Sequence, residues 1–191
     1  GQGGELEDIF VEVNFGYNYY AGAGTPGAGE IDLFSVLLHE VTHGLGFASL
    51  TLEDGNSIFF DGGGNPAQTR SGLDAVMFTA NGDKMFNDNT GAILQPVSWL
   101  TGSPGALQHR GAEVVAEQGA NGENLHTPAT FAEGTSLSHW DTLISGVMLP
   151  SFGAQELRRE YVEAELAALR DLGYTIAEDE PTSVEEWLSH E

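Results

Sequence analysis

The sequence predicts one α+β domain, and three observations support this prediction. Apolar residues recur at helical spacing over residues 33–44 and again over about 159–171, whereas residues 50–137 hold short apolar runs between Gly, Asn and Asp. The chain has 191 residues, of which 40% are hydrophobic, so it can bury the core of a compact domain. We expect this domain to cover residues 1–177, followed by an acidic tail at residues 178–191.

The first segment, residues 8–15 (DIFVEVNF), has the β-branched and aromatic residues that are typical of a half-buried strand. Gly16 should end this strand. Residues 17–29 are rich in Gly and Pro and predict an irregular surface loop. Asp32 follows as the expected N-cap of a helix.

Residues 33–44 (LFSVLLHEVTHG) form the expected helix. Apolar residues recur at helical spacings of three and four, which predicts a buried apolar stripe on one helix face: Leu33, Leu37 and Val41, and Leu38, Val41 and Leu45. The glycines at 44 and 46 offer a stop signal.

The stretch from residue 50 to residue 137 predicts short strands and turns, and the last helix should run from about Arg159 to Asp171. In that helix Val162, Leu166 and Leu169 share one face, and Gly173 lies just beyond its end.

The charge of the chain excludes some classes of partner. There are 29 acidic and 6 basic residues, giving a net charge of -23, so nucleic acid is not an expected partner. The acidity favours solubility in salt, and attraction of basic peptides is the alternative. With no cysteine the chain has no disulfide and no thiolate ligand, and no apolar run reaches the roughly 18 residues of a membrane span. Gly1 suggests that a leader or propeptide has been removed from a secreted protein.

The strongest chemical signal is His39-Glu40-Val41-Thr42-His43. Two imidazoles four residues apart lie on the same helix face, where both can reach one zinc ion at about 2.0–2.1 Å. Glu40 points to one side of them and can accept a proton from a water at the metal. Two incidental histidines are the alternative, but unpaired polar side chains in so apolar a helix would be costly.

The residues after this motif resemble the metzincin metalloproteases. Gly46 stands three residues after His43, where that group has a glycine that turns the chain. The usual contiguous motif would place a third histidine at position 49, where this chain has Ser49.

Downstream, the chain resembles the leishmanolysin family, a metzincin branch with a long insertion before the third histidine. Ser138-His139-Trp140 is followed by Met148-Leu149-Pro150, in the order of that family's third ligand and Met-turn. Residues 128–131 (PATF) also resemble a segment of bacterial secreted proteases.

The resemblance implies a metzincin-like fold with an insertion at about 48–137, and the activity of a secreted zinc endopeptidase acting on a peptide or protein. It implies that His39, His43 and His139 bind the zinc ion and that Glu40 is the general base. Met148 would lie beneath the metal. Pro150 occupies the position of a tyrosine found in some metzincins, so no side chain is assigned to stabilise an oxyanion.

Other readings of the site stay open. A thermolysin-like site would use Glu160 or Glu163 as the third ligand. His109 reads as a surface residue and His190 as part of the tail, whereas His126 can be read either way. Trp140 reads as a packing residue.

The acidic turns at residues 53–56 and 61–65 could hold calcium, although solvated turns are the simpler reading because neither turn has EF-hand spacing. At the level of function, a zinc hydrolase acting on a non-protein amide and a catalytically silent zinc-bound adhesion or binding domain are the alternatives.

Overall fold

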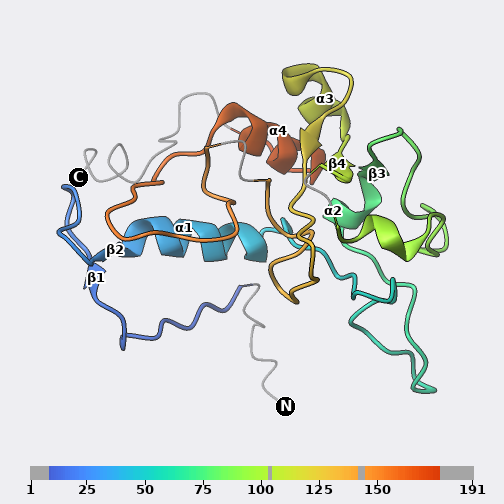
Figure 1. Ribbon diagram of the computed structural model, residues 1–191, viewed down its shortest axis with the longest axis horizontal. Coiled ribbons are helices and arrows are strands. Elements are labelled where there is room, and N and C mark those ends of the chain that lie inside the picture. Colours follow the sequence, from blue (N-terminus) through green and yellow to red (C-terminus); the bar gives the residue numbers. More distant parts are fainter. Residues whose placement is uncertain (1–8, 103–104, 142–144, 177–191) are drawn as a thin grey trace, which may run out of the picture.

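The computed structural model describes residues 9–102, 105–141 and 145–176, which fold into short helices and small sheets (Figure 1). Within this part of the chain the helices are α1 (Leu33–Gly44), α2 (Gly72–Ala75), α3 (Ala112–Gln118) and α4 (Glu163–Asp171), with the 3₁₀ helix η1 (Val97–Trp99). The strands are β1 (Tyr19–Tyr20), β2 (Ile31–Asp32), β3 (Met77–Thr79), β4 (Leu107–His109) and β5 (Glu123–Asn124). The tail expected at residues 178–191 lies outside the described residues.

Helix α1 begins and ends where the sequence predicts. Asp32 is its N-cap, and the Asp32 carboxylate accepts a hydrogen bond from the Ser35 amide at 2.8 Å. Beyond its end, Gly46 has φ 102°, a left-handed conformation that favours glycine.

The predicted apolar stripe of α1 is only half-buried, and of its residues Leu38 packs against the core. Leu33, Leu37 and Val41 are only half-buried, whereas the fully buried residues of α1 are Ser35, His39 and Thr42. This polar face can be buried because its groups have partners. The hydroxyl groups of Thr42 and Tyr161 are 2.7 Å apart, and the Ser35 hydroxyl accepts a hydrogen bond from the Arg158 amide at 2.8 Å.

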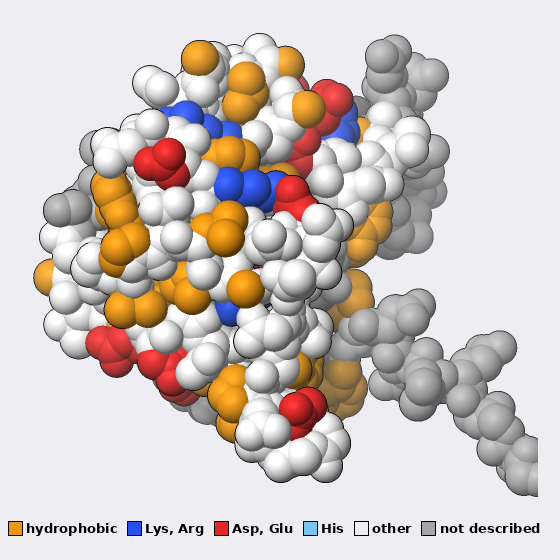
Figure 2. Space-filling view, turned by 90° about the vertical axis from the view of Figure 1, so that its right-hand side faces the viewer, with side chains coloured by type: hydrophobic (Ala, Val, Ile, Leu, Met, Phe, Trp, Pro, Cys, Tyr) orange, Lys and Arg blue, Asp and Glu red, His pale blue; other side chains and the backbone are white. Residues whose placement is uncertain are grey.

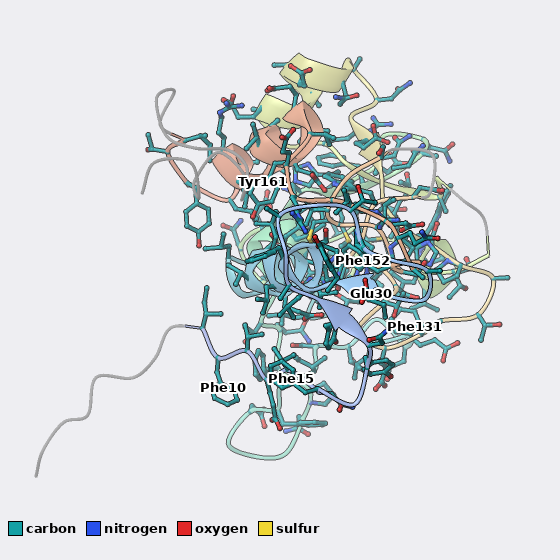
Figure 3. The ribbon with its side chains drawn as sticks, turned by 90° about the vertical axis from the view of Figure 1, so that its left-hand side faces the viewer. Phe10, Phe15, Glu30, Phe131, Phe152 and Tyr161 are labelled. Atoms are coloured by element: carbon teal, nitrogen blue, oxygen red, sulfur yellow. The ribbon has the colours of Figure 1, made fainter. Side chains whose placement is uncertain are left out.

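The strand predicted at residues 8–15 is wrong for its described part, residues 9–15, which form no strand. Phe10 and Phe15 are 77% and 76% exposed, and both lie on a segment at the edge of the molecule (Figure 3). Within the described residues no strand pairs with this segment, so its apolar side chains have no sheet face to bury. The loop that follows contains β1, which pairs in parallel with β2.

A buried arginine attaches that glycine-rich loop to the start of α1. The Arg159 guanidinium donates hydrogen bonds to the Asp32 carboxylate and to the carbonyl oxygens of Gly22 and Ala23. Burial by itself raises the pKa of Asp32, but the hydrogen bonds from Arg159 and Ser35 hold it below its usual value. The N-cap is therefore ionised, as a helix N-terminus prefers.

Residues 48–137, where an insertion was expected, contain a three-stranded sheet. Strands β3, β4 and β5 form an antiparallel sheet in that order, with Met77 opposite His109 and Gln108 opposite Asn124. The prediction of short strands is confirmed here, but helices α2 and α3 were not predicted.

Apolar side chains are scattered over the face of the molecule shown in Figure 2, among a few acidic and basic ones.

The last helix, α4, ends at Asp171 as predicted but begins at Glu163, four residues later than expected. Val162 has an extended backbone with ψ 159°, so the chain is not yet helical there. Helix α4 packs against α3, and its residues Ala167 and Ala168 join a core that includes Phe47, Trp140 and Met148. In the described part of the chain, no helix has the length and apolar character needed to cross a membrane.

Candidate metal centre

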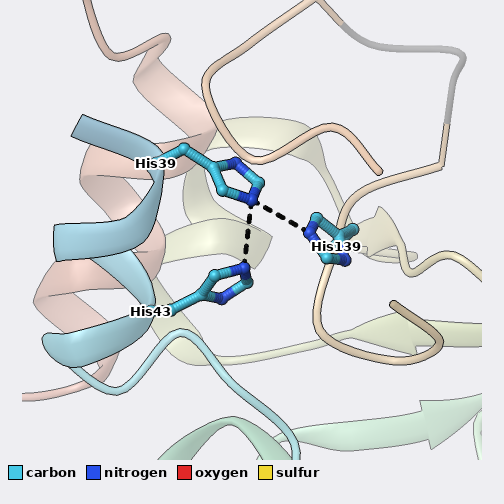
Figure 4. Close-up of side chains that lie close together, drawn as sticks. All are labelled: His39, His43 and His139. Atoms are coloured by element: carbon cyan, nitrogen blue, oxygen red, sulfur yellow. Dashed lines mark hydrogen bonds between the residues drawn. The ribbon is translucent and has the colours of Figure 1, made fainter. Parts of the chain in front are cut away.

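Three histidines from two distant parts of the chain meet at one point (Figure 4). His39 and His43 lie one turn apart on α1, and their Nε2 atoms are 3.1 Å from each other. His139 lies 100 residues further along the chain, and its Nε2 lies 3.2 Å from the Nε2 of His39. Among the residues that the structure describes, this group could hold a metal ion, since its ligand atoms lie within 4.8 Å of one another.

The other ring nitrogen of each histidine meets a backbone carbonyl. The Nδ1 atoms of His39, His43 and His139 lie 2.8, 2.8 and 2.7 Å from the carbonyl oxygens of Val147, Phe47 and Thr135. A carbonyl oxygen only accepts hydrogen bonds, so each Nδ1 carries the proton. Each neutral ring therefore presents the Nε2 lone pair, which is the form that binds metals.

The two Nε2–Nε2 distances that involve His39 fit a tetrahedral ion. Two nitrogens bound to one zinc at about 2.0–2.1 Å are about 3.3–3.4 Å apart, close to the observed 3.1 and 3.2 Å. Burial lowers the pKa of His39, and it lowers the pKa of His139 to about 3. Near neutral pH the rings of His39 and His139 are therefore uncharged. Nε2 lone pairs that converge on one point repel one another unless a cation lies between them.

Backbone hydrogen bonds on both sides hold His139 in place. Its carbonyl accepts from the His126 amide at 2.8 Å, and the next residue, Trp140, donates its amide to the carbonyl of Met148 at 2.8 Å. Leu137 has φ 68°, an uncommon conformation for a leucine, at the point where the chain turns into this segment. The segment that carries His139 is thus positioned by strand-like contacts formed only in the folded chain.

Ser49, which stands where the contiguous metzincin motif has a histidine, lies beside this segment. Its amide donates to the Ser138 hydroxyl at 3.0 Å, and its own hydroxyl donates to Asp74 at 2.6 Å. Asp74 is fully buried and also accepts from the Leu50 amide at 3.0 Å and the Thr51 hydroxyl at 3.1 Å. This carboxylate was not identified from the sequence. Ser71 and Asp74 nevertheless have the spacing of a capping box, and they form one.

Glu40 is exposed on α1 next to His39, and its negative charge favours the protonated form of that ring. The imidazole of His39 also meets the ring of Phe152 edge to face, with centroids 5.1 Å apart. Phe152 and Tyr161 are both labelled in Figure 3, and both contact buried residues of α1. One acidic side chain and one aromatic ring therefore border the histidine cluster.

Met148 is fully buried and belongs to the core. Its amide donates a 2.7 Å hydrogen bond to Glu165, a buried carboxylate on α4 that sequence reasoning missed. Burial raises the pKa of Glu165, and hydrogen bonds from the backbone of Met148, Val162 and Val147 oppose that shift. No pattern in the sequence separates Glu165 from the exposed acids near it.

His109 was predicted at the surface, and this prediction is wrong. It is completely buried, because it lies on an inward position of β4 with its ring 5.8 Å from the ring of Trp140. Its Nδ1 accepts a 3.2 Å hydrogen bond from the Gly111 amide and lies 3.8 Å from Asp171. Burial lowers the pKa of His109 to about 4.

The remaining candidates do not join the cluster. His126 is half-buried, and Glu160 and Glu163 are exposed; none of them belongs to the described metal-binding group. His190 lies outside the described residues. Trp140 is fully buried against Phe47, with ring centroids 4.8 Å apart, as expected of a packing residue.

The acidic turns use their carboxylates locally. Asp54 accepts from the Asn56 amide at 2.9 Å, and Asp61 accepts from the Gly63 and Asn65 amides at 2.8 and 2.9 Å. Such contacts are those of ordinary Asx turns.

Comparison with known proteins leaves the family open. No family model matches the chain, and no solved structure matches it. A protein of Schizosaccharomyces pombe described as uncharacterized is 48% identical over 42 residues, which are 22% of this chain. The match spans 7% of that relative's length.

Proposed function

We propose that this protein is a zinc hydrolase whose metal is held by His39, His43 and His139. The observation that carries the proposal is the convergence of three Nε2 lone pairs while each Nδ1 is held by a carbonyl. Three imidazole ligands suit zinc, and three protein ligands leave the fourth position open, as in catalytic rather than structural zinc sites.

Within that class we propose a secreted endopeptidase with a metzincin-like fold. The order of sequence features supports it: two histidines on a helix, a long insertion, a third histidine, and then Met148 and a C-terminal helix. The substrate would be a peptide or protein.

Glu40 and the backbone carbonyls around the cluster have specific roles in the proposed hydrolysis. When bound, zinc supplies the Lewis acidity that polarises a carbonyl group and acidifies a water molecule. Glu40 takes the proton from the attacking water and returns it to the leaving amine. The carbonyls of Val147, Phe47 and Thr135 keep the three rings in the orientation and tautomer that leave Nε2 free.

The test is cleavage of casein and of a quenched-fluorescence peptide library by the zinc-loaded protein, before and after removal of zinc with a chelator. Glu40→Gln should keep its zinc and lose at least about a hundredfold in rate, because general-base steps are typically worth that much. Glu117→Gln, at an exposed position of α3, is the matched control for the change in charge. Near-normal turnover by Glu40→Gln would remove the assigned role of Glu40.

The same preparation separates the alternatives. Zinc-dependent cleavage of a non-protein amide, with peptides left intact, would indicate a hydrolase of another substrate. Tight zinc binding without cleavage of either would indicate a binding domain.

A further inference from the structure

The peptide group of one of the three carbonyls that hold the histidines is itself held by an acidic side chain. The carbonyl of Val147, which meets His39 Nδ1 at 2.8 Å, belongs to the same peptide group as the amide of Met148. That amide donates to Glu165 Oε1 at 2.7 Å. A single peptide group therefore stands between the Glu165 carboxylate and the imidazole of His39.

We infer that Glu165 is a positioning residue that orients His39 and strengthens it as a metal ligand through the peptide group between Val147 and Met148. This inference rests on the proposed metal site. It assigns to a buried residue of α4 the part that a carboxylate plays when it contacts a metal-bound histidine directly.

The geometry supports an effect that passes through the peptide. The group is planar, so a carboxylate that fixes the N–H also fixes the direction of the carbonyl on its other side. Hydrogen bonds at both ends of a peptide group polarise one another, so the acceptor at the N–H of Met148 makes the carbonyl oxygen of Val147 a better acceptor. A stronger bond from Nδ1–H in turn makes Nε2 a better electron donor.

His139 provides an internal comparison. Its carbonyl partner, Thr135, shares a peptide group with the amide of Ser136, and that amide donates to the carbonyl of Ala132 at 2.8 Å. The support behind His139 is thus a neutral backbone group, whereas the support behind His39 is a carboxylate.

The side chain of Glu165 is held in one position by the groups around it. Its side chain is 1% exposed, and its second oxygen accepts from the Val162 amide at 3.0 Å. A Cβ atom on Gly146 would lie 2.6 Å from Oε1, so the close approach of the carboxylate requires glycine at that position. Both observations indicate a carboxylate with little freedom to move away from the peptide group.

The test compares the full chain with Glu165→Gln and with the control Glu163→Gln, which makes the same change at an exposed position of α4. Zinc affinity is measured by competition with a chelator, and the visible spectrum of the cobalt-substituted protein reports the ligand geometry. Glu165→Gln should bind zinc about 10–100-fold more weakly, the size expected for loss of a partner behind a ligand. Its cobalt spectrum should change, and the control should match the wild type in both.

The outcomes are distinguishable. Unchanged zinc affinity in folded Glu165→Gln, even with a lower melting temperature, would show that Glu165 only stabilises the fold, and would leave the metal site intact. Failure of the folded wild-type protein to bind zinc would remove the metal site and this role together. If Glu165→Gln does not fold, Gly146→Ala decides, because it displaces the carboxylate without removing its charge and should also weaken zinc binding.

Discussion

His139 and His109 are both buried, at 4% and 0% exposure, yet their nitrogens face different partners. His139 directs Nδ1 to a carbonyl and Nε2 to another histidine. His109 accepts a hydrogen bond at Nδ1 from Gly111, so its neutral ring carries the proton on Nε2, which has no partner among the described residues. Burial therefore does not identify a metal ligand, whereas the direction of the free lone pair does.

The largest expected effect separates the two histidines by zinc binding. His139→Ala should lose at least about a hundredfold in zinc affinity, more than loss of a partner behind a ligand usually costs. His109→Gln should keep the affinity of the wild type, because His109 directs no lone pair to the cluster. Chelator competition measures both. A folded His139→Ala protein with full zinc affinity would overturn the ligand set and the family resemblance together.

The next prediction concerns stability rather than zinc affinity. His109→Ala should lower the free energy of unfolding of the metal-free protein by roughly 2–4 kcal/mol, since it empties a filled position in the core against Trp140. Its zinc affinity, measured on the folded protein, should not change. Urea titration of the chelator-treated protein gives the stability, and a loss below about 0.5 kcal/mol would contradict the packing role.

Acid should destabilise the metal-free protein partly through His109. The pKa of His109 is lowered from 6.5 to about 4 in the folded protein, so between these values the unfolded chain binds more protons. The contribution of His109 is complete above pH 6.5 and is lost as the pH falls toward 4. In His109→Gln, the free energy of unfolding should fall with acid by up to about 1.4 kcal/mol less per pH unit in this window. Equal slopes in urea titrations at pH 7, 6 and 5 would mean that His109 keeps its usual pKa.

The smallest effect concerns Met148. Met148→Leu conserves side-chain volume in the core and should cost less than about 1.5 kcal/mol. The amide that contacts Glu165 and the nitrogens of the three histidines stay unchanged, so zinc affinity should too. If this variant lost zinc while remaining folded, Met148 would act on the site by more than packing.

The errors made from the sequence share a cause. Residues 8–15 have strand-like composition, and the half-buried stripe of Leu33, Leu37 and Val41 has helical periodicity, yet neither pattern says what the segment packs against. In α1 the inward face is polar, since Ser35 and Thr42 find partners near α4. His109 has polar neighbours in the sequence but lies on the buried side of a sheet. In each case the environment, which comes from distant residues, decided the outcome.

What the sequence by itself determined is the local part of the site. The four-residue spacing of His39 and His43 on a helix capped by Asp32 follows from helix geometry, which acts within a few residues. Only the tertiary structure decided the rest. His139 reaches His39 across 100 residues, and Glu165 reaches the amide of Met148 from another helix. Both contacts depend on how the whole chain packs. The family resemblance implied His139 as a ligand through the order of motifs around it, but not its distance from His39, whereas no pattern in the sequence distinguished Glu165.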